Sequence, residues 1–407
     1  MGLPEGPANP SLDAAEPFPF FQALLIPQLL AILLITQRAP RLLRLAFNAV
    51  YTTYGVHVCF SGRYTMGNVL ADYSLGLAVT MQYLTFWAHL WCLEDSNGRK
   101  HVLDAVRHED DTFEKIRPAE RGLIGRVLWA YALLQSSRSV GWSCQVKGVP
   151  DTPEQSKSKF IATSLLRCLK YYVILDAGIW YTHQPGFTFG PNATSITAFP
   201  FLKRCITVWF QGACGYATIN MQYLLLGVVC VALGVSEPKR WPKLFGRVRD
   251  AYTVRRFWGN SWHQMLRRFI GPLTTSLMSF LSIPHGTRLS SNATLLIAFG
   301  ISSFLHLSGD VAAHIPWKQA TAIFFPVQPL AIMAEDLVIE WFNGGRNKPN
   351  RLTGKNLVVV KLLGGIWVFM WFVLTIPLFV DAQMKGRIGE DRAIPKEWSL
   401  VQRLMSA

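Results

Sequence analysis

Eight long apolar runs restrict this chain to folds that place much of its length inside a lipid bilayer. A helix needs about 20 mostly apolar residues to cross a bilayer, and it satisfies its backbone polar groups internally. The sequence therefore predicts an all-α polytopic integral membrane protein with about eight transmembrane helices, within a range of seven to nine. The runs lie at 18–36, 45–60, 69–93, 163–181, 205–235, 294–309, 320–341 and 357–380.

Charge supports a membrane protein and predicts its orientation. Charged residues make up 16% of the chain, below the roughly 25% of soluble domains, and the formal net charge is +15. With the amino end in the lumen, Lys and Arg collect in the cytoplasmic loops 37–44, 94–162, 236–293 and 342–356. The carboxyl tail is an exception, because it is basic yet comes out lumenal. Membrane loops explain the excess positive charge, so we predict no nucleic-acid partner.

Two segments do not fit a simple span. The fifth run is long, and Gly212–Gly215 marks a place where its helix is expected to tilt strongly or break. The region near 257–283 has the character of an interfacial or re-entrant segment. With no repeat and no separable soluble part, residues 1–407 are expected to form one membrane-embedded domain. In this orientation the sequon at Asn192 is lumenal and available for glycosylation, whereas that at Asn292 is cytoplasmic.

An aromatic and basic segment precedes a histidine within an apolar run. The segment is Phe257-Trp258-Gly259-Asn260-Ser261-Trp262-His263-Gln264, inside a basic stretch from Lys239 to Arg268. His306 follows in the apolar run 295–307, where an ionisable group is costly and therefore a functional candidate. A neutral imidazole can serve as a general base, or it can be a packed histidine bonded to a neighbouring helix.

Other polar residues allow competing interpretations. His306, Asp310 and His314 are spaced to share a helical face and could bind a metal, but the last two fall where the helix leaves the membrane, so we predict no metal site. The HxxxD string that begins at His306 is treated as accidental. Glu335 and Asp336 are expected to line a polar cavity or to form structural ion pairs. Asp110 and Asp111 resemble a diphosphate-binding motif, but no second acidic motif accompanies them and a solvated charge run is the favoured interpretation.

The Phe257-Trp258-Gly259…Trp262-His263-Gln264 block, His306 and Glu335-Asp336 together resemble the membrane-bound O-acyltransferase superfamily. Within it, the chain is similar to the wax synthase-like branch of fungi. The motif-bearing part covers about residues 250–345. At the place of His263 many relatives carry Asn, so the role of this residue is open.

The resemblance implies an enzyme that moves an acyl group from coenzyme A to a hydroxyl, with His306 as catalytic base and His263 as a second catalytic residue. No bound cofactor is expected, and acyl-CoA is a co-substrate. The basic and aromatic segment is expected to bind coenzyme A. The residues concerned are Trp258, Trp262, Gln264, Arg255, Arg256 and Arg267.

The resemblance also favours a substrate class. Acetyl transfer from acetyl-CoA to a lipophilic terpenoid or meroterpenoid alcohol is the expected reaction, in a multi-pass protein of the endoplasmic reticulum. A long-chain wax ester or lipid acyltransferase is the alternative within the family. In other classes, a transporter could use the intramembrane acids and histidine as a proton relay. A prenyltransferase or terpene cyclase could use Asp110 and Asp111.

Overall fold

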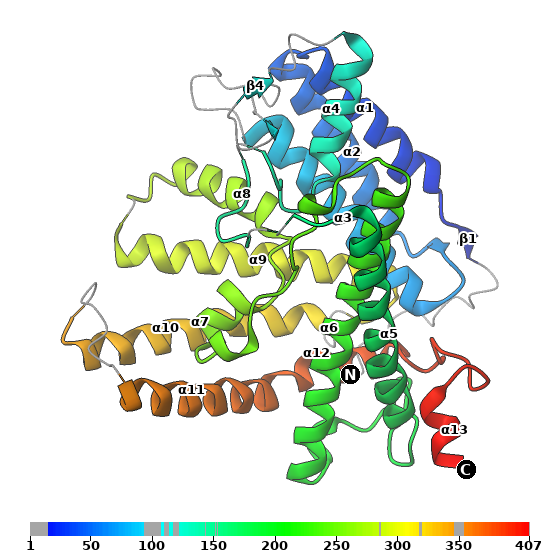
Figure 1. Ribbon diagram of the computed structural model, residues 1–407, viewed down its shortest axis with the longest axis vertical. Helices are drawn as coiled ribbons and strands as arrows, with labels where there is room; N and C mark the ends of the chain where they lie inside the picture. Colours follow the sequence, from blue (N-terminus) through cyan, green and yellow to red (C-terminus); the bar gives the residue numbers. More distant parts are fainter. Residues whose placement is uncertain are drawn as a thin grey trace, which may run out of the picture. The chain divides into compact units, whose positions relative to one another are not determined.

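The computed structural model describes residues 15–92, 107–109, 114–116, 122–142, 144–150, 152, 154–284, 286–316, 320–345 and 354–406. The predicted acidic motif at Asp110 and Asp111 lies outside these residues. The chain is mostly helical (Figure 1) and divides into two compact units. The first unit comprises residues 1–145 and 266–326, and the second comprises 146–265 and 327–407.

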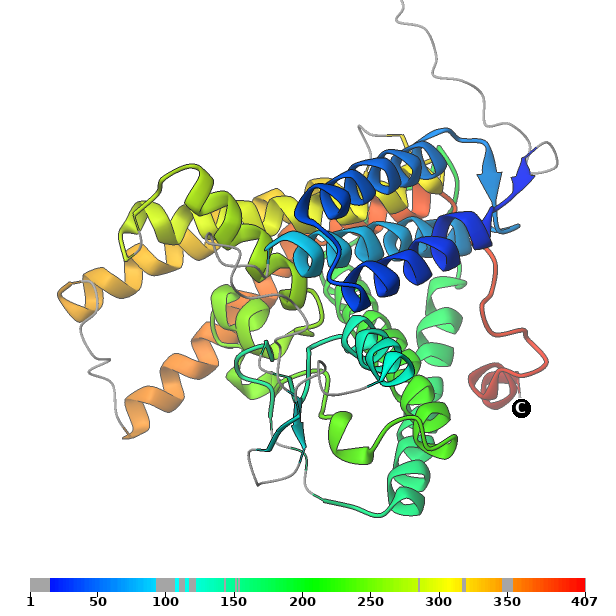
Figure 2. The same cartoon turned by 90° about the horizontal axis from the view of Figure 1, so that it is seen from above.

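The first unit is a group of helices with two short strand pairs. Parallel strands β1 (Glu16–Pro17) and β2 (Tyr64–Thr65) pair with each other, as do antiparallel β3 (Arg107–Glu109) and β4 (Glu114–Ile116). In the view of Figure 2, α2 and α3 run alongside each other. The helices are η2 (Phe21–Leu25), α1 (Ile26–Thr36), α2 (Arg41–Phe60), α3 (Val69–Trp87), η3 (Ala88–Cys92), α4 (Leu123–Gln135), α8 (Arg267–Phe280), α9 (Arg288–Ala312) and η11 (Thr321–Ile323).

The second unit contains the longest helix and the aromatic block. Helix α10 (Phe324–Asn343) begins in the first unit and continues into the second. The other helices are α5 (Lys157–Thr182), η6 (Ile196–Ala198), α6 (Phe201–Ala232), η7 (Pro238–Arg240), η8 (Val248–Asp250), α7 (Val254–Arg256), η9 (Phe257–Ser261), α11 (Gly354–Thr375), α12 (Pro377–Lys385) and α13 (Leu400–Ser406).

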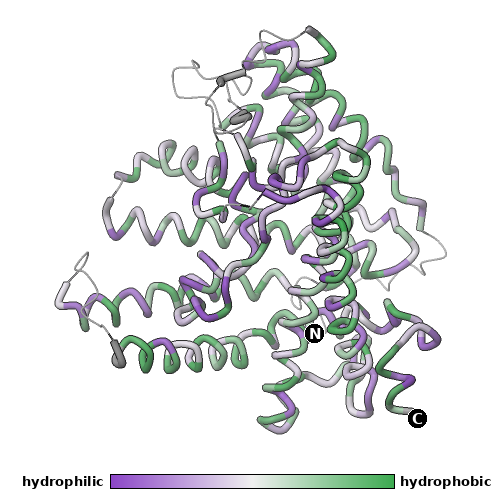
Figure 3. Tube along the Cα trace, viewed as in Figure 1, coloured by the Kyte–Doolittle hydropathy of each residue, from purple (hydrophilic) through white to green (hydrophobic). Residues whose placement is uncertain are grey.

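Each of the eight apolar runs contains helix, so a mostly helical chain is confirmed, with two short strand pairs that the all-α prediction did not include. Among the described residues, four helices are long and apolar enough to cross a membrane: Phe201–Ala232, Arg288–Ala312, Thr321–Asn343 and Leu357–Lys385. Apolar residues follow α11 along most of its length (Figure 3). The count of about eight spans therefore stays a prediction.

Helix α6 corrects one expectation, because it runs for 32 residues without a break at Gly212–Gly215. Neither glycine is forced into an unusual backbone conformation, and Gly215 lies against the Trp262 ring. The close approach to α5 occurs instead at Gly178. A Cβ atom there would lie 2.1 Å from the sulfur of Cys214 on α6. Small residues therefore let these two helices pack tightly, as they do between membrane helices.

Helix α9 is longer than the apolar run that predicted it. Thr287 caps it by accepting a hydrogen bond from the Ser290 amide at 3.0 Å, which adds a turn before the apolar residues. His314 ends it in the left-handed conformation, with φ +57°. The Ile315 amide then donates to the Asp310 carbonyl and the His314 amide to the Val311 carbonyl, as in a Schellman motif. These caps fix where α9 places its polar side chains.

Candidate active site

Helices α3 and α9 approach each other closely, and this contact positions His306. A Cβ atom on Gly76 would lie 2.3 Å from the Ser308 carbonyl oxygen, and one on Gly309 would lie 2.9 Å from the Tyr73 carbonyl oxygen. Only glycine fits at such distances. The Ser308 hydroxyl, fully buried, lies 3.0 Å from the Gly76 carbonyl oxygen, to which it can donate. The two backbones therefore meet one helical turn from His306.

Two side chains hold the imidazole ring of His306, one at its edge and one on its face. Its Nδ1 atom lies 2.6 Å from the hydroxyl of Tyr73 on α3. Its ring stacks on Phe325 of α10, with centroids 4.2 Å apart and planes inclined by 19°. His306 is half-buried, whereas Tyr73 is 5% exposed. The imidazole is thus fixed in orientation, as a general base in an apolar helix needs to be.

A line of polar groups continues from Tyr73 into the protein. The Tyr73 hydroxyl lies 3.1 Å from the Thr321 hydroxyl, which donates to Oδ1 of Asp310 at 2.6 Å. The Ala322 amide donates to the other carboxylate oxygen at 3.0 Å. Asp310 and Thr321 are both fully buried. All of these groups belong to the first unit, so His306 is connected to a buried carboxylate through two hydroxyls.

The side chains of His306, Asp310 and His314 do not share one helical face. Asp310 is occupied by Thr321 and Ala322, and His314 lies beyond the end of α9 against Gly62. Within the described part of the chain, no three His, Cys, Asp or Glu side chains are grouped as metal ligands. Helix α9 ends at Ala312, two residues before His314, so the spacing along the chain does not place the three side chains on one face.

The aromatic block forms a compact turn in the second unit. Trp258 and Trp371 both donate their indole N–H to the amide oxygen of Gln328, at 3.2 and 3.0 Å. Gln328 is fully buried. Gln264 donates to the Trp258 carbonyl at 3.2 Å and to the Trp262 carbonyl at 2.6 Å. The tryptophans and Gln264 therefore hold the turn against α10 and α11.

His263 lies in this turn, beside Phe245 and Trp262. Its Nδ1 atom is buried and has no hydrogen-bond partner among the described residues. Burial lowers the pKa of His263 to about 4, because the imidazolium loses its hydration. The side chain is therefore neutral at physiological pH. A buried nitrogen without a partner is costly, which makes His263 a candidate for contact with a ligand.

The two carboxylates of α10 have structural contacts. Glu335 accepts from the amides of Val254 and Arg255, at 2.6 and 3.1 Å, and from the Trp367 indole at 2.8 Å. Asp336 forms a bidentate pair with the Arg255 guanidinium. Of the two alternatives for these acids, the structure favours ion pairing and capping. They fasten α7, which leads into the aromatic block, to α10.

The other two arginines that were expected to bind coenzyme A, Arg256 and Arg267, lie in different units. The Arg256 guanidinium lies over the Tyr252 ring at 4.5 Å, and Arg267 begins α8 in the first unit. His263 and the aromatic block belong to the second unit, and His306 belongs to the first. The structure therefore groups Trp258, Trp262, His263 and Gln264, and separately groups His306 with Tyr73.

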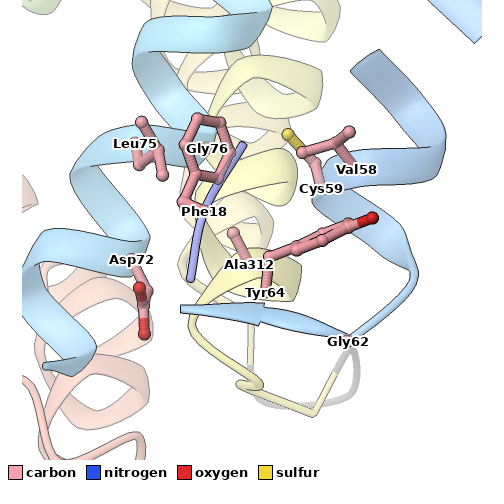
Figure 4. Close-up of a pocket in the computed structure, with 9 residues that line it drawn as sticks. All are labelled: Phe18, Val58, Cys59, Gly62, Tyr64, Asp72, Leu75, Gly76 and Ala312. Atoms are coloured by element: carbon pink, nitrogen blue, oxygen red, sulfur yellow. The ribbon is translucent and has the colours of Figure 1, made fainter. Parts of the chain in front are cut away.

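Each unit of the described chain has a hollow that can be compared with the size of a substrate. The first holds about 10 Å³ and lies where Asp72 and Gly76 of α3 face the end of α2 (Figure 4). It has room for one water molecule and is far too small for a substrate. The second holds about 470 Å³ and opens to the surface. Glu154 and Glu237 line it beside Lys239, and these acids make it unfavourable for a phosphate.

Comparison with known proteins places this arrangement in a family. Residues 241–327 match the membrane bound O-acyl transferase family, and residues 156–232 match the C-terminal domain of aspirochlorine biosynthesis protein F. Acetyltransferase ple2 of Rhodocybe pseudopiperita is 35% identical over 276 residues, 66% of this chain and 69% of the relative. This chain belongs to the membrane-bound O-acyltransferase family. It is accordingly a membrane-bound O-acyltransferase.

Two further relatives show the range of names among similar proteins. Acetyltransferase eriL of Hericium erinaceus is 31% identical over 292 residues, covering 69% of this acyltransferase and 73% of the relative. The O-mevalon transferase macI of Penicillium terrestre is 29% identical over 302 residues, covering 69% and 64%. No solved structure matches this chain. The resemblance inferred from the aromatic block and the histidine is therefore confirmed.

Sequence reasoning missed Tyr73 and Thr321 beside His306, and it missed the connection of Asp310 to this histidine. Tyr73 and Thr321 lie in the predicted apolar runs 69–93 and 320–341, where neither is distinctive. Asp310 was noticed as a possible metal ligand and in the HxxxD string, but without its connection to the histidine. An acid four residues after a histidine, at a predicted helix end, was the one available signal.

Proposed function

We propose that this acyltransferase moves an acetyl group from acetyl-CoA to a hydroxyl of a lipophilic secondary metabolite of terpenoid or meroterpenoid type. The observation that carries the proposal is the fixed imidazole of His306, bonded at Nδ1 to Tyr73 and stacked on Phe325 within an apolar helix. Membership of the family supplies the reaction class, and the names of ple2 and eriL support the acetyl group.

The proposed reaction needs no covalent enzyme intermediate, because a thioester is already activated. The alcohol oxygen attacks the thioester carbon while His306 accepts the hydroxyl proton. The tetrahedral oxyanion then collapses, the carbon–sulfur bond breaks, and the coenzyme A thiolate takes the proton from the imidazolium. His306 is thus regenerated within one cycle.

His263 is proposed as the second polar group, in contact with the thioester carbonyl or the acceptor alcohol. Its neutral ring and its buried Nδ1 without a described partner support this role. Arg256 and Arg267 are proposed to contact the coenzyme A phosphates. Trp258 and Trp262 are proposed to anchor the turn rather than to react, since their contacts are with Gln328 and neighbouring rings. We place the protein in the endoplasmic reticulum.

The macI relative favours one alternative, transfer of a larger acyl group, because its name is O-mevalon transferase. Its identity to this chain is below that of ple2 and eriL, so acetyl remains the proposed group.

The proposal is tested by incubating microsomes that contain the protein with labelled acetyl-CoA, palmitoyl-CoA and a panel of lipophilic alcohols. We expect acetyl esters of terpenoid alcohols, identified by mass spectrometry. His306→Ala is expected to abolish transfer while the protein still accumulates in membranes. The matched control is His57→Ala, which removes an exposed histidine of α2 and is expected to leave transfer unchanged. Full activity of His306→Ala would contradict the role of His306.

A further inference from the structure

We infer that Asp310, acting through Thr321 and Tyr73, keeps a proton on Nδ1 of His306 and so makes Nε2 the atom that accepts the proton of the alcohol. The inference rests on the proposed function, in which His306 is the general base. Asp310, Thr321 and Tyr73 are positioning residues in this scheme, since they act through the histidine rather than on substrate.

The order of protons follows from counting donors. A hydroxyl has one proton, and an ionised carboxylate has none. Thr321 donates its proton to Oδ1 of Asp310, at 2.6 Å. The Tyr73 hydroxyl must therefore donate in its 3.1 Å contact with Thr321. With that proton used, Tyr73 is an acceptor towards His306, and the 2.6 Å contact requires a proton on Nδ1.

The alternative arrangement leaves one contact without a proton. If Tyr73 donated to Nδ1 of His306 while Thr321 donated to Asp310, the Tyr73 and Thr321 oxygens would face each other at 3.1 Å with lone pairs only. In a buried site such a pair is repulsive, because no water relieves it. With Asp310 ionised, only the single direction from histidine to carboxylate satisfies all three contacts.

The relay requires Asp310 to be ionised, and the fold offers hydrogen-bond donors to both of its carboxylate oxygens. Both oxygens of Asp310 accept hydrogen bonds, one from Thr321 and one from the Ala322 amide at 3.0 Å. Hydrogen bonds donated to a carboxylate favour its charged form. Because the backbone amide of Ala322 cannot turn around, it fixes which carboxylate oxygen faces Thr321. The tautomer of a histidine is set by the partner of its other nitrogen, and here that partner is set by Asp310.

The most informative variant is Asp310→Asn. It should reverse the direction of the hydrogen bonds in the relay while leaving a proton in each of the three contacts. The Ala322 amide must face the oxygen of the new side chain, so the NH2 group faces Thr321. Thr321 would then donate to Tyr73, and Tyr73 would donate to Nδ1 of His306. The histidine proton moves to Nε2, where it blocks the base.

The test combines a spectroscopic and a kinetic measurement on the full-length protein in detergent micelles. In ¹⁵N-histidine NMR, assigned with His306→Gln, we expect the Nδ1–H tautomer in the wild type and the Nε2–H tautomer in Asp310→Asn. We expect kcat to fall on the order of 10³- to 10⁴-fold in Asp310→Asn, the size of effect seen when a wrong tautomer is imposed on a catalytic histidine. KM for acetyl-CoA should change less than about twofold, since no binding group is lost.

Thr321 provides a matched pair of controls. Thr321→Ser keeps the hydroxyl and should retain both the tautomer and most of kcat, whereas Thr321→Val keeps the shape and should lose both. An Nε2–H tautomer in the wild type would overturn the inference, as would an unchanged tautomer in Asp310→Asn. Because NMR reports the tautomer without turnover, a wild-type protein that transfers no acetyl group would count against the proposed function alone.

Discussion

Gly76 on α3 and Ser308 on α9 are in direct backbone contact, with the Ser308 hydroxyl 3.0 Å from the Gly76 carbonyl oxygen. Thr80, one turn further along α3, donates to the same hydroxyl at 2.7 Å. This contact sets the register in which Tyr73 meets His306, although 233 residues separate the two along the chain. The close approach of the two helices at Gly76 and Gly309 is therefore a condition for the candidate site.

Gly76→Ala should destabilise the protein, because the added Cβ would lie 2.3 Å from the Ser308 carbonyl oxygen, on backbone that cannot turn away. We expect a loss of about 1–3 kcal/mol in thermal unfolding of the detergent-solubilised protein, and reduced kcat. Gly300→Ala on α9 is the control, since nothing lies within 4 Å of its Cβ position. That variant should be neutral or slightly stabilising. Equal stability of both variants would contradict the close packing.

Gln328→Leu should weaken the second unit, because it leaves the indole N–H groups of Trp258 and Trp371 without their acceptor. A buried donor without a partner costs about 1–3 kcal/mol. We expect a lower unfolding temperature and altered tryptophan fluorescence. Trp371→Phe in the Gln328→Leu background removes one of the unpaired donors, so the double variant should lose less stability than the two single losses added together. Additive losses would argue against the shared acceptor.

Stability should fall as the pH is lowered from about 6.5 to about 4, owing to His263. Its pKa in the folded protein is about 4, below the ordinary 6.5, so the unfolded chain binds more protons in this window. The contribution is fully present above pH 6.5 and amounts to at most about 3 kcal/mol. Thermal unfolding at pH 7.5, 6 and 5 measures it. His263→Gln should show a shallower pH dependence, and parallel curves for the two proteins would refute the assignment.

Glycosylation tests the predicted orientation. Asn192 is exposed in a turn, and Thr194 of its sequon is exposed as well. If the 183–199 loop is lumenal, expression in a eukaryotic cell should give a protein whose electrophoretic mobility increases on treatment with a glycosidase. Asn192→Gln should abolish that change. Asn292→Gln should not affect it, because that sequon lies within α9 and is predicted to be cytoplasmic. Glycosylation at Asn292 and not at Asn192 would show that the membrane orientation is the reverse of the predicted one.

The sequence by itself determined the helical, membrane-embedded class and the family. Apolar runs of spanning length leave few alternatives to helices, since lipid offers no partner for backbone polar groups. His306 is distinctive because an ionisable side chain is costly within an apolar run, and the Phe257…Gln264 block because its aromatic residues lie within a basic stretch. Local patterns of this kind are visible without any knowledge of which helices touch.

Only the tertiary structure decided which groups surround His306. Tyr73 and Thr321 are ordinary residues in the sequence, and they become partners of the histidine because Gly76 and Gly309 let α3 and α9 meet. The end of α9 likewise separated His314 from Asp310 and placed the acid beside Thr321. Hydrogen bonds act over about 3 Å. Spacing along a chain therefore does not reveal pairs that distant segments form.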